Sequence, residues 1–427
     1  MSRLWNHNLR RRSVLKLGAA GAAILAAPWS VRRPAFAQAA SPHFCVVFQA
    51  NGGWDPTQVF DVHDPADQTD GVDVDLPGQP ASIITTVGGI TYISNPVTRP
   101  AVDTFFTNWA SQSCIVNGVH TRSTSHNQSR QLVATGFLDP TKADFAVMSA
   151  HHNGSDLPLP HLHLSGESFA GPFAGMSGRL GGAMGEAVNH NRMDDSDELA
   201  ISDVGEVYIR QALEEQRLLD IQAQRAITGG LAGFDDGNDR GDLLAEMAAE
   251  VNIRGNSGSQ LATTLAQAFR TGLTTSATFS RFGGFDTHGD NSGQNGQFDN
   301  LFTFLDQFLT GLALEPGVAA PNMLQETTVV ATSDFSRTPK FNGGGGKDHH
   351  PWASYLLVGK RVRGGMTVGR TDSNQEGMTV DYNTGQPSAT GQVVDVANMV
   401  AGLMTLMGAN ANTYLPGVPP ITAFVNA

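Results

Sequence analysis

Residues 44–55 read FCVVFQANGGWD: five apolar residues with high strand propensity run into a polar turn that contains two glycines. Short apolar runs bounded by Gly, Pro or polar clusters are typical of buried strands in a parallel sheet. Four more runs share this character, at 114–119, 277–280, 327–331 and 355–358. The five runs are therefore predicted to be strands of a largely parallel central sheet.

Helical patterns lie between these runs. Apolar residues keep i, i+3, i+4, i+7 spacing over 298–309 and 393–407, which predicts helices with one buried face. A third helix is predicted over 206–226, inside a helical and loop insertion around 185–260. Alternating strands and helices indicate an α/β fold with helices flanking both faces of the sheet. Residues 38–427, with this insertion included, are expected to form a single domain.

The charge of the chain is unevenly distributed. The 427 residues carry 27 Lys and Arg against 40 Asp and Glu, a formal net charge of -13. Residues 1–37 hold seven of the basic residues and none of the acidic ones, so the remainder has 20 basic and 40 acidic residues, a net charge of -20. Such a surface repels phosphate backbones, so nucleic acid is not expected as a partner. A single disulfide between Cys45 and Cys114 is one alternative, but both sit in apolar runs, where buried free thiols are the more common arrangement.

Residues 1–37 are predicted to be a twin-arginine signal peptide. Arg11-Arg12-Ser13-Val14-Leu15-Lys16 precedes an apolar stretch over 17–28, and Ala35-Phe36-Ala37 has the shape of a cleavage site. An N-terminal membrane anchor is the alternative, but the apolar stretch is about twelve residues against the roughly 20 that a bilayer needs. We expect the twin-arginine export machinery to be a partner, the mature protein to be periplasmic or secreted, and no stable membrane insertion.

Residues of metal-ligand type follow four of the predicted strands. Ligands bind at the carboxyl ends of strands in open α/β sheets, so these side chains are expected to meet in one cleft. The candidate metal ligands are Asp55, Asp286, His288, Asp334, His349 and His350. Taken singly, Asp55 also fits a turn-forming role. Adjacent histidines in a strand point to opposite faces, so one of His349 and His350 is expected to be the ligand.

Carboxylate and imidazole ligands without thiolates favour Zn²⁺, Mn²⁺ or Ca²⁺, as one or two ions. Such ions activate a hydroxyl group for attack at phosphorus or sulfur. Ser125 is the candidate nucleophile, because a predicted helix begins just after it, with Thr124 and Ser123 as rivals. Arg337 or Arg122 is the candidate for binding anionic oxygens. The pairs His151-His152 and His161-x-His163 are expected to be loop or sheet-edge residues instead.

Four segments together resemble an exported bacterial family, domain of unknown function 1501. They are Gly284-Phe285-Asp286-Thr287-His288-Gly289-Asp290-Asn291, Ser333-Asp334-Phe335-Ser336-Arg337-Thr338-Pro339, Asp348-His349-His350-Pro351 and Gly364-Gly365-Met366-Thr367-Val368-Gly369. The family is similar to the alkaline phosphatase and sulfatase superfamily. That resemblance implies an alkaline-phosphatase-like three-layer sandwich and a metal-dependent hydrolase, with the Asp and His residues above as ligands and a hydroxyl nucleophile near Ser125.

The chain departs from the family pattern in two places. Asp334-Phe335-Ser336-Arg337 stands where the family usually has Glu before Phe-Gly-Arg, and Trp54 and Pro56 flank Asp55 where Asn and Gly are common. Neither cysteine is in a Cys-x-Pro-x-Arg motif, so formylglycine chemistry is excluded.

Two functions are therefore expected as alternatives. The first is hydrolysis of a small anionic phosphate or sulfate ester at a one- or two-metal site. The second is a non-catalytic extracytoplasmic binding or assembly protein that keeps the same scaffold.

Overall fold

The computed structural model describes residues 42–67, 69–179 and 257–426, together with six positions between 208 and 218. Those six positions, at 208, 211, 212, 214, 215 and 218, are all helical and fall within the helix predicted over 206–226. The predicted signal peptide and most of the predicted insertion around 185–260 lie outside the described residues.

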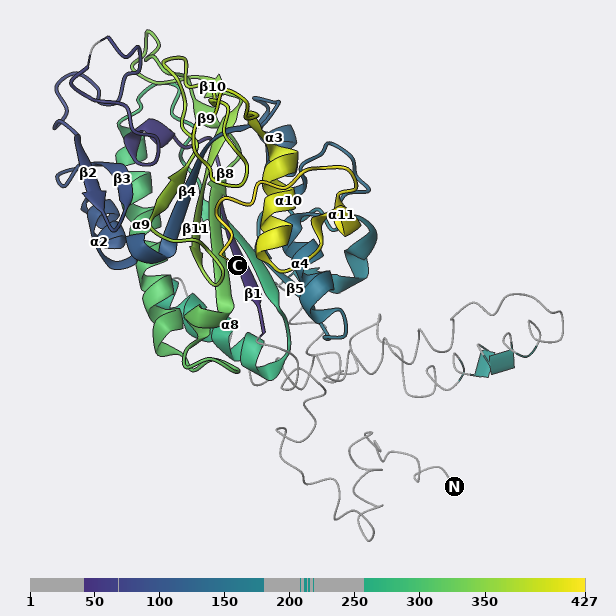
Figure 1. Cartoon of the computed structure of the whole chain (residues 1–427). Helices are drawn as coiled ribbons and strands as arrows, with labels where there is room; N and C mark the ends of the chain where they lie inside the picture. Colours follow the sequence, from purple (N-terminus) through teal and green to yellow (C-terminus); the bar gives the residue numbers. More distant parts are fainter. Residues whose placement is uncertain are drawn as a thin grey trace, which may run out of the picture. The chain divides into compact units, whose positions relative to one another are not determined.

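The described residues build a central sheet of nine strands (Figure 1). Eight of them follow the order β12-β4-β11-β8-β1-β7-β5-β6, and β13 pairs with β4. Their bounds are β1 Phe44–Ala50, β4 Ser113–His120, β5 His161–Ser165, β6 Ser177–Arg179, β7 Ser276–Phe282, β8 Thr327–Ser333, β11 Trp352–Gly359, β12 Met366–Val368 and β13 Val394–Asp395. The five predicted strands are all present, and β1 lies at the centre between β8 and β7.

The sheet is mixed but largely parallel, as predicted. β1 runs parallel to both β7 and β8, whereas β11 is antiparallel to β8 and to β4. The predicted strand at 355–358 therefore lies within the sheet but runs in the reverse direction. β1, β7 and β8 are parallel, and because β11 is antiparallel to both β8 and β4, β4 also runs in their direction. The carboxyl ends of these four strands therefore share one edge of the sheet.

Helices cover both faces of the sheet (Figure 1). Val47 of β1 belongs to a core cluster shared with α4 and α10, whereas the Phe48 ring packs on Phe308 of α9 at a centroid distance of 5.0 Å. Alternate residues of β1 thus face opposite layers, which confirms the expected helix-sheet-helix arrangement. The helices are α2 Pro100–Trp109, α3 His126–Thr135, α4 Phe145–Gly154, α8 Gly258–Thr271, α9 Gly293–Leu314, α10 Val396–Leu406 and α11 Ala411–Tyr414.

Two small antiparallel pairs lie outside the main sheet. One joins β2 Ile83–Val87 to β3 Ile90–Ser94. The other joins β9 Ser336–Arg337 to β10 His349–His350 and pairs His349 with Arg337. Arg337 and His349, two predicted site residues that are twelve positions apart in the sequence, thus lie opposite each other.

Both cysteines are buried and unbridged, as predicted. Burial raises the pKa of Cys45 to about 12, so its thiol stays protonated at neutral pH. Within the residues that the structure describes, no helix combines the length and the apolar character needed to cross a membrane.

The buried imidazole of His161 makes the fold sensitive to acid. His161 of β5 is fully buried, and its Nδ1 lies 2.6 Å from Ser276 Oγ, which itself donates to the Ala146 carbonyl. The Nε2 atom has no hydrogen-bond partner among the described residues. Burial lowers the pKa of His161 to about 3. The ring is therefore neutral in the folded chain at pH values where an unfolded histidine is charged.

We predict that this group lowers the free energy of unfolding as the pH falls from about 6.5 towards 3, because only the unfolded chain takes up the proton in that window. The loss is about 1.4 kcal/mol per pH unit for one full proton. Urea unfolding between pH 4 and 7 should show a shallower pH dependence in His161→Leu than in the wild type. The exposed His152 offers a control, and His152→Asn should keep the wild-type slope. Equal slopes in all three proteins would contradict the prediction.

Candidate metal centre

Three side chains from distant segments meet above the carboxyl edge of the sheet. His126 is the first residue of α3, Asp286 follows β7, and His349 lies in β10. One ligand atom from each lies within 4.8 Å of the other two. His288 joins them, with its Nε2 atom 3.1 Å from Asp286 Oδ1 and 2.9 Å from His349 Nε2. We call these four residues, His126, Asp286, His288 and His349, the metal-ligand cluster.

Each imidazole of the cluster is held from behind by an oxygen acceptor. His126 Nδ1 lies 2.6 Å from Asp334 Oδ2, His288 Nδ1 lies 3.0 Å from Asp348 Oδ1, and His349 Nδ1 lies 2.9 Å from the Thr124 carbonyl. Ionised carboxylates and carbonyls only accept hydrogen bonds, so we assign the ring proton to Nδ1 in all three. The lone pair on each Nε2 is then left for the cluster, the arrangement in which histidines bind metals.

The spacing of the donor atoms fits a single ion. His349 Nε2 lies 3.2 Å from Asp286 Oδ1, and His126 Nε2 lies 3.6 Å from Asp286 Oδ2. Tetrahedral ligands about 2.05 Å from a Zn²⁺ ion lie about 3.3 Å from one another. A proton or a metal ion between His288 Nε2 and His349 Nε2, which lie 2.9 Å apart, removes the repulsion between their lone pairs. These residues therefore form a His and Asp group able to hold a metal ion.

Asp334, expected as a ligand, lies behind His126 instead of beside the other ligand atoms. The carboxylate is fully buried and accepts hydrogen bonds from Gly53 N at 2.7 Å and Ser333 Oγ at 3.0 Å. Its hydrogen bond with His126 raises the pKa of that histidine. Asp334 therefore orients His126 and is a support of the metal-ligand cluster.

Arg337 holds Asp286 and contacts protein atoms on all sides. The guanidinium is fully buried and donates to the carbonyls of Gly52, Gly53 and Lys347 and, over 2.7 Å, to Asp286 Oδ1. Partial burial works to raise the pKa of Asp286, but the Arg337 guanidinium outweighs it, and the pKa falls to about 2. Asp286 is therefore ionised at any physiological pH.

The other candidate arginine is also engaged. Arg122 donates from Nε to Asp395 over 2.7 Å and from Nη2 to the Gly136 carbonyl over 2.9 Å. Both arginines that the sequence suggested for binding anionic oxygens are thus engaged with protein acceptors, Arg337 with Asp286 of the cluster and Arg122 with Asp395.

Asp55 lies apart from the cluster, in a buried ion pair. Its Oδ2 atom is 2.8 Å from Lys347 Nζ, and both side chains are fully buried. Asn291 Nδ2 donates to the same carboxylate over 2.8 Å, and Thr57 Oγ1 donates over 2.6 Å. The lone pairs of Asp55 are thus shared among protein donors, and the structure does not bring it together with the other predicted ligands.

His349 and His350 take opposite sides of β10, as the strand geometry predicted. His349 joins the metal-ligand cluster, whereas His350 is hydrogen-bonded to the backbone of Gln375 and burial lowers its pKa. Ser125 and Thr124 are exposed immediately before His126. Ser125 is the N-cap residue of α3, yet its side chain makes no capping hydrogen bond.

Sequence reasoning missed His126, although it selected the tract in which His126 lies. The same rule that identified Asp286 and His349, a ligand-type residue shortly after a strand, also points to His126, which begins α3 after β4. It also missed Asp348, which orients His288, and Lys347, whose partner Asp55 is 292 positions away. Buried ion-pair partners that far apart carry no local signal.

The chain is an α/β protein with a metal-ligand cluster at the carboxyl edge of its sheet. Comparison with known proteins assigns it to a family. The chain belongs to the family described as protein of unknown function DUF1501, whose model matches residues 43–418. The family resemblance of the sequence is thereby confirmed. None of the curated proteins compared with the chain matches it.

Several solved structures share its general architecture. One is a protein in the alkaline phosphatase superfamily from Vibrio parahaemolyticus, at 9% identity over 87% of this chain and 68% of that one, with a TM-score of 0.35. Another is the C-terminal periplasmic domain of EcEptC from Escherichia coli, at 9% identity, 91% and 89% coverage and a TM-score of 0.38. TAB5 alkaline phosphatase follows at 12% identity, 79% and 96% coverage and a TM-score of 0.31. These values describe a distant likeness that assigns no activity to the chain.

The orienting role of Asp334 predicts a change in metal affinity. An asparagine at this position can present its amide N–H₂ to His126 Nδ1 and so favour the wrong ring tautomer. We expect Asp334→Asn to bind Zn²⁺ about 10- to 100-fold more weakly than the wild type, measured by competition with a chromophoric chelator. His151→Ala is the control, because His151 Nδ1 bonds to Tyr414 OH away from the cluster. An unchanged affinity in Asp334→Asn would show that Asp334 does not orient a ligand.

The buried pair of Asp55 and Lys347 predicts a loss of stability instead. Asp55→Asn leaves the Lys347 ammonium buried without a counter-charge, which should cost about 3–5 kcal/mol in the free energy of unfolding. The double variant Asp55→Asn/Lys347→Met should recover most of that loss. Both variants should still bind Zn²⁺ with near wild-type affinity where they are folded. A loss of the ion from the stable double variant would instead make Asp55 a ligand.

Proposed function

We propose that the chain is an exported, metal-dependent hydrolase of phosphate or sulfate esters. The observation that carries this proposal is that the Nε2 atoms of His126, His288 and His349 lie 3.6, 3.1 and 3.2 Å from the carboxylate oxygens of Asp286, with each ring fixed by an oxygen acceptor at Nδ1. A metal ion bound among these nitrogen atoms would stabilise this arrangement. The basic, acid-free segment over 1–37 supports export by the twin-arginine machinery to the periplasm or the medium.

The ligand set favours Zn²⁺ or Mn²⁺ over Ca²⁺. Three imidazole nitrogens and one carboxylate suit these ions, whereas Ca²⁺ takes oxygen ligands almost throughout. His126, His288, His349 and Asp286 would hold the ion. When bound, such an ion supplies positive charge that stabilises developing negative charge on an ester and lowers the pKa of a nearby hydroxyl group.

Ser125 is the residue of this chain best placed to attack the ester. It precedes His126, its hydroxyl is not used to cap α3, and the first N–H groups of the ten-residue helix α3 favour anionic oxygens at this point. In the proposed reaction the Ser125 oxygen bonds to phosphorus or sulfur, and the alcohol departs with a proton. Water then cleaves the covalent ester and restores the serine. Thr124, also exposed, is the second candidate for this role.

One observation favours the alternative, a protein that binds a metal or an anion without turnover. Both candidate arginines are committed to protein acceptors, Arg337 to three carbonyls and Asp286, and Arg122 to Asp395. A hydrolase of this design must therefore stabilise the anionic oxygens of its substrate with the metal ion and the N-terminus of α3.

Hydrolysis of aryl phosphate and aryl sulfate esters separates these functions. The purified chain loaded with Zn²⁺ or Mn²⁺ should release the aryl alcohol, and a chelator should abolish release. We expect Ser125→Ala to fall to the level seen with chelator. Ser129→Ala should retain turnover, because the Ser129 hydroxyl is buried in the same helix and donates to the Ser123 carbonyl. A stably bound ion with no release of either alcohol would support the binding function.

A further inference from the structure

A third arginine lies on the same helix as one residue of the metal-ligand cluster. Arg130 is four residues beyond His126 on α3, and side chains at this spacing share one face of a helix, with about 5–6 Å between their Cβ atoms. Long side chains on a helix lean towards its N-terminus. Arg130 does so, because its Nη2 atom donates to Asn127 Oδ1 over 2.6 Å. The guanidinium therefore reaches back towards the turn of α3 that begins after Ser125.

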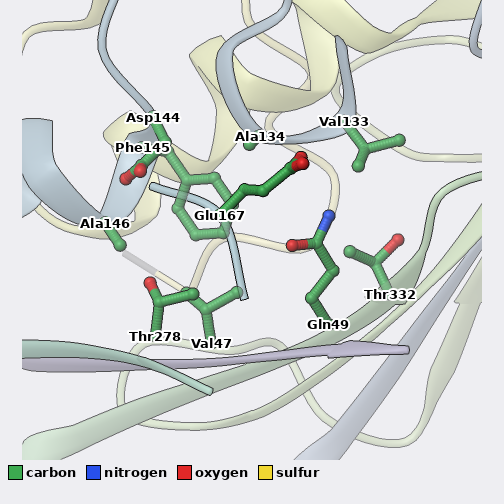
Figure 2. A pocket seen from close by; sticks show the side chains of 10 residues that line it. All are labelled: Val47, Gln49, Val133, Ala134, Asp144, Phe145, Ala146, Glu167, Thr278 and Thr332. Atoms are coloured by element: carbon green, nitrogen blue, oxygen red, sulfur yellow. The ribbon is translucent and has the colours of Figure 1, made fainter. Parts of the chain in front are cut away.

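Glu167 holds this guanidinium from a neighbouring loop. It follows β5, which is parallel to β7, so Glu167 lies at the same carboxyl edge of the sheet as Asp286. Arg130 Nε lies 3.1 Å from Glu167 Oε2, and Nη2 lies 3.4 Å from Oε1. Figure 2 shows the Glu167 side chain extending towards α3, on the side of Val133 and Ala134, beside a cavity with room for about one water molecule. The pair thus connects α3 to the loop after β5.

The ion pair leaves Arg130 able to bind a further anion. Within the part of the chain that the structure describes, Nη1 has no hydrogen-bond acceptor, whereas Nε and Nη2 are both engaged. The side chains of Arg130 and Glu167 are 22% and 48% exposed. Ion pairs this exposed contribute little to stability, so an anion held by the metal ion can compete with Glu167 for the guanidinium. Arg337, which is fully buried among protein acceptors, has no such freedom.

We propose that Arg130 binds the anionic oxygens of the ester, through Nη1 and by exchanging Glu167 for the ligand. A planar guanidinium donates two parallel hydrogen bonds to a phosphoryl or sulfuryl group, which suits it to this role. It also adds a positive charge on the helix that carries His126, in a chain whose residues beyond 37 have a net charge of -20. The assignment of the anion to a substrate rests on the proposed function, whereas binding of a free anion needs no turnover.

Calorimetric titration of inorganic phosphate into the Zn²⁺-loaded chain tests this role. Arg130→Gln should raise the phosphate dissociation constant about 10- to 100-fold, the effect of losing charge-assisted hydrogen bonds. Glu167→Gln should lower it about two- to fivefold, because Arg130 is released from a competing partner. Both variants lose the same ion pair, so a purely structural role of the pair predicts changes in the same direction. Competition with a chelator should show near wild-type Zn²⁺ affinity in both.

Arg270→Gln is the matched control. Arg270 forms a similar pair with Glu315, with 2.9 Å between Nη1 and Oε2 and side chains that are 25% and 19% exposed. It lies near the end of α8, shortly before β7 begins, and therefore at the opposite edge of the sheet from the cluster. Its loss should leave phosphate affinity unchanged. The effect of Arg130→Gln should persist in 1 M NaCl, where a Debye length of about 3 Å screens charges that do not contact the ligand.

Several results would overturn the proposal. They are no saturable phosphate binding, equal affinity in Arg130→Gln and the wild type, changes in the same direction in both variants, an effect that disappears in 1 M NaCl, and a loss of Zn²⁺ affinity that accounts for the effect.

Turnover separates this proposal from the proposed function. If phosphate binds through Arg130 but no aryl ester is hydrolysed, the proposed hydrolysis fails while the anion site stands. If aryl phosphate is hydrolysed with a KM that Arg130→Gln leaves unchanged, the role of Arg130 fails while hydrolysis stands.

Discussion

The arrangement of the metal-ligand cluster depends on one tight turn, Gly52-Gly53, at the end of β1. Its N–H groups bind the Asp334 carboxylate, and its carbonyls bind the Arg337 guanidinium. Both glycines have positive φ, and a Cβ atom on either would lie 2.5 Å from its nearest neighbour, the Asp286 backbone nitrogen or the Phe335 ring. Only glycine is compatible with this approach. The turn thus fixes the residue that orients His126 and the residue that holds Asp286.

A second constraint ties the cluster to the buried ion pair that lies apart from it. Lys347 anchors on Asp55 through its ammonium group, and its carbonyl accepts from Arg337. Because Lys347 is two residues before His349, this anchor positions the chain that enters β10. The pair therefore stabilises the 338–348 connection, whereas the ligand side chains themselves are held by Asp334, Asp348, Arg337 and the Thr124 carbonyl. Both cations are fully buried, and each is balanced by a carboxylate, which is the condition for keeping a charge inside a protein.

Sequence patterns predicted the location of the functional residues more accurately than the contacts of each residue. The five apolar runs and the residues after them followed from local chemistry, and the alternation of His349 and His350 followed from strand geometry. The role of Asp334 could not be predicted in this way, because the N–H groups of Gly52 and Gly53 that donate to it come from a segment 281 residues away. The partner of Asp55 could not be predicted either, since a carboxylate after two glycines has the same local pattern whether it faces an ion or Lys347. The reversed direction of β11 is likewise set by connections and not by its own residues.

The charge around the cluster argues for one ion. With neutral imidazoles, the carboxylates of Asp286, Asp334 and Asp348 and the Arg337 guanidinium leave the empty centre with a net charge of minus two. A single divalent ion neutralises it, whereas a second would be uncompensated because Asp55 is already paired with Lys347. The centre without metal also repels anions, in a chain that is strongly acidic beyond residue 37. Under the proposed function, metal binding would therefore precede the approach of an anionic ester, so that occupancy by the ion and affinity for the ester would be coupled through electrostatics.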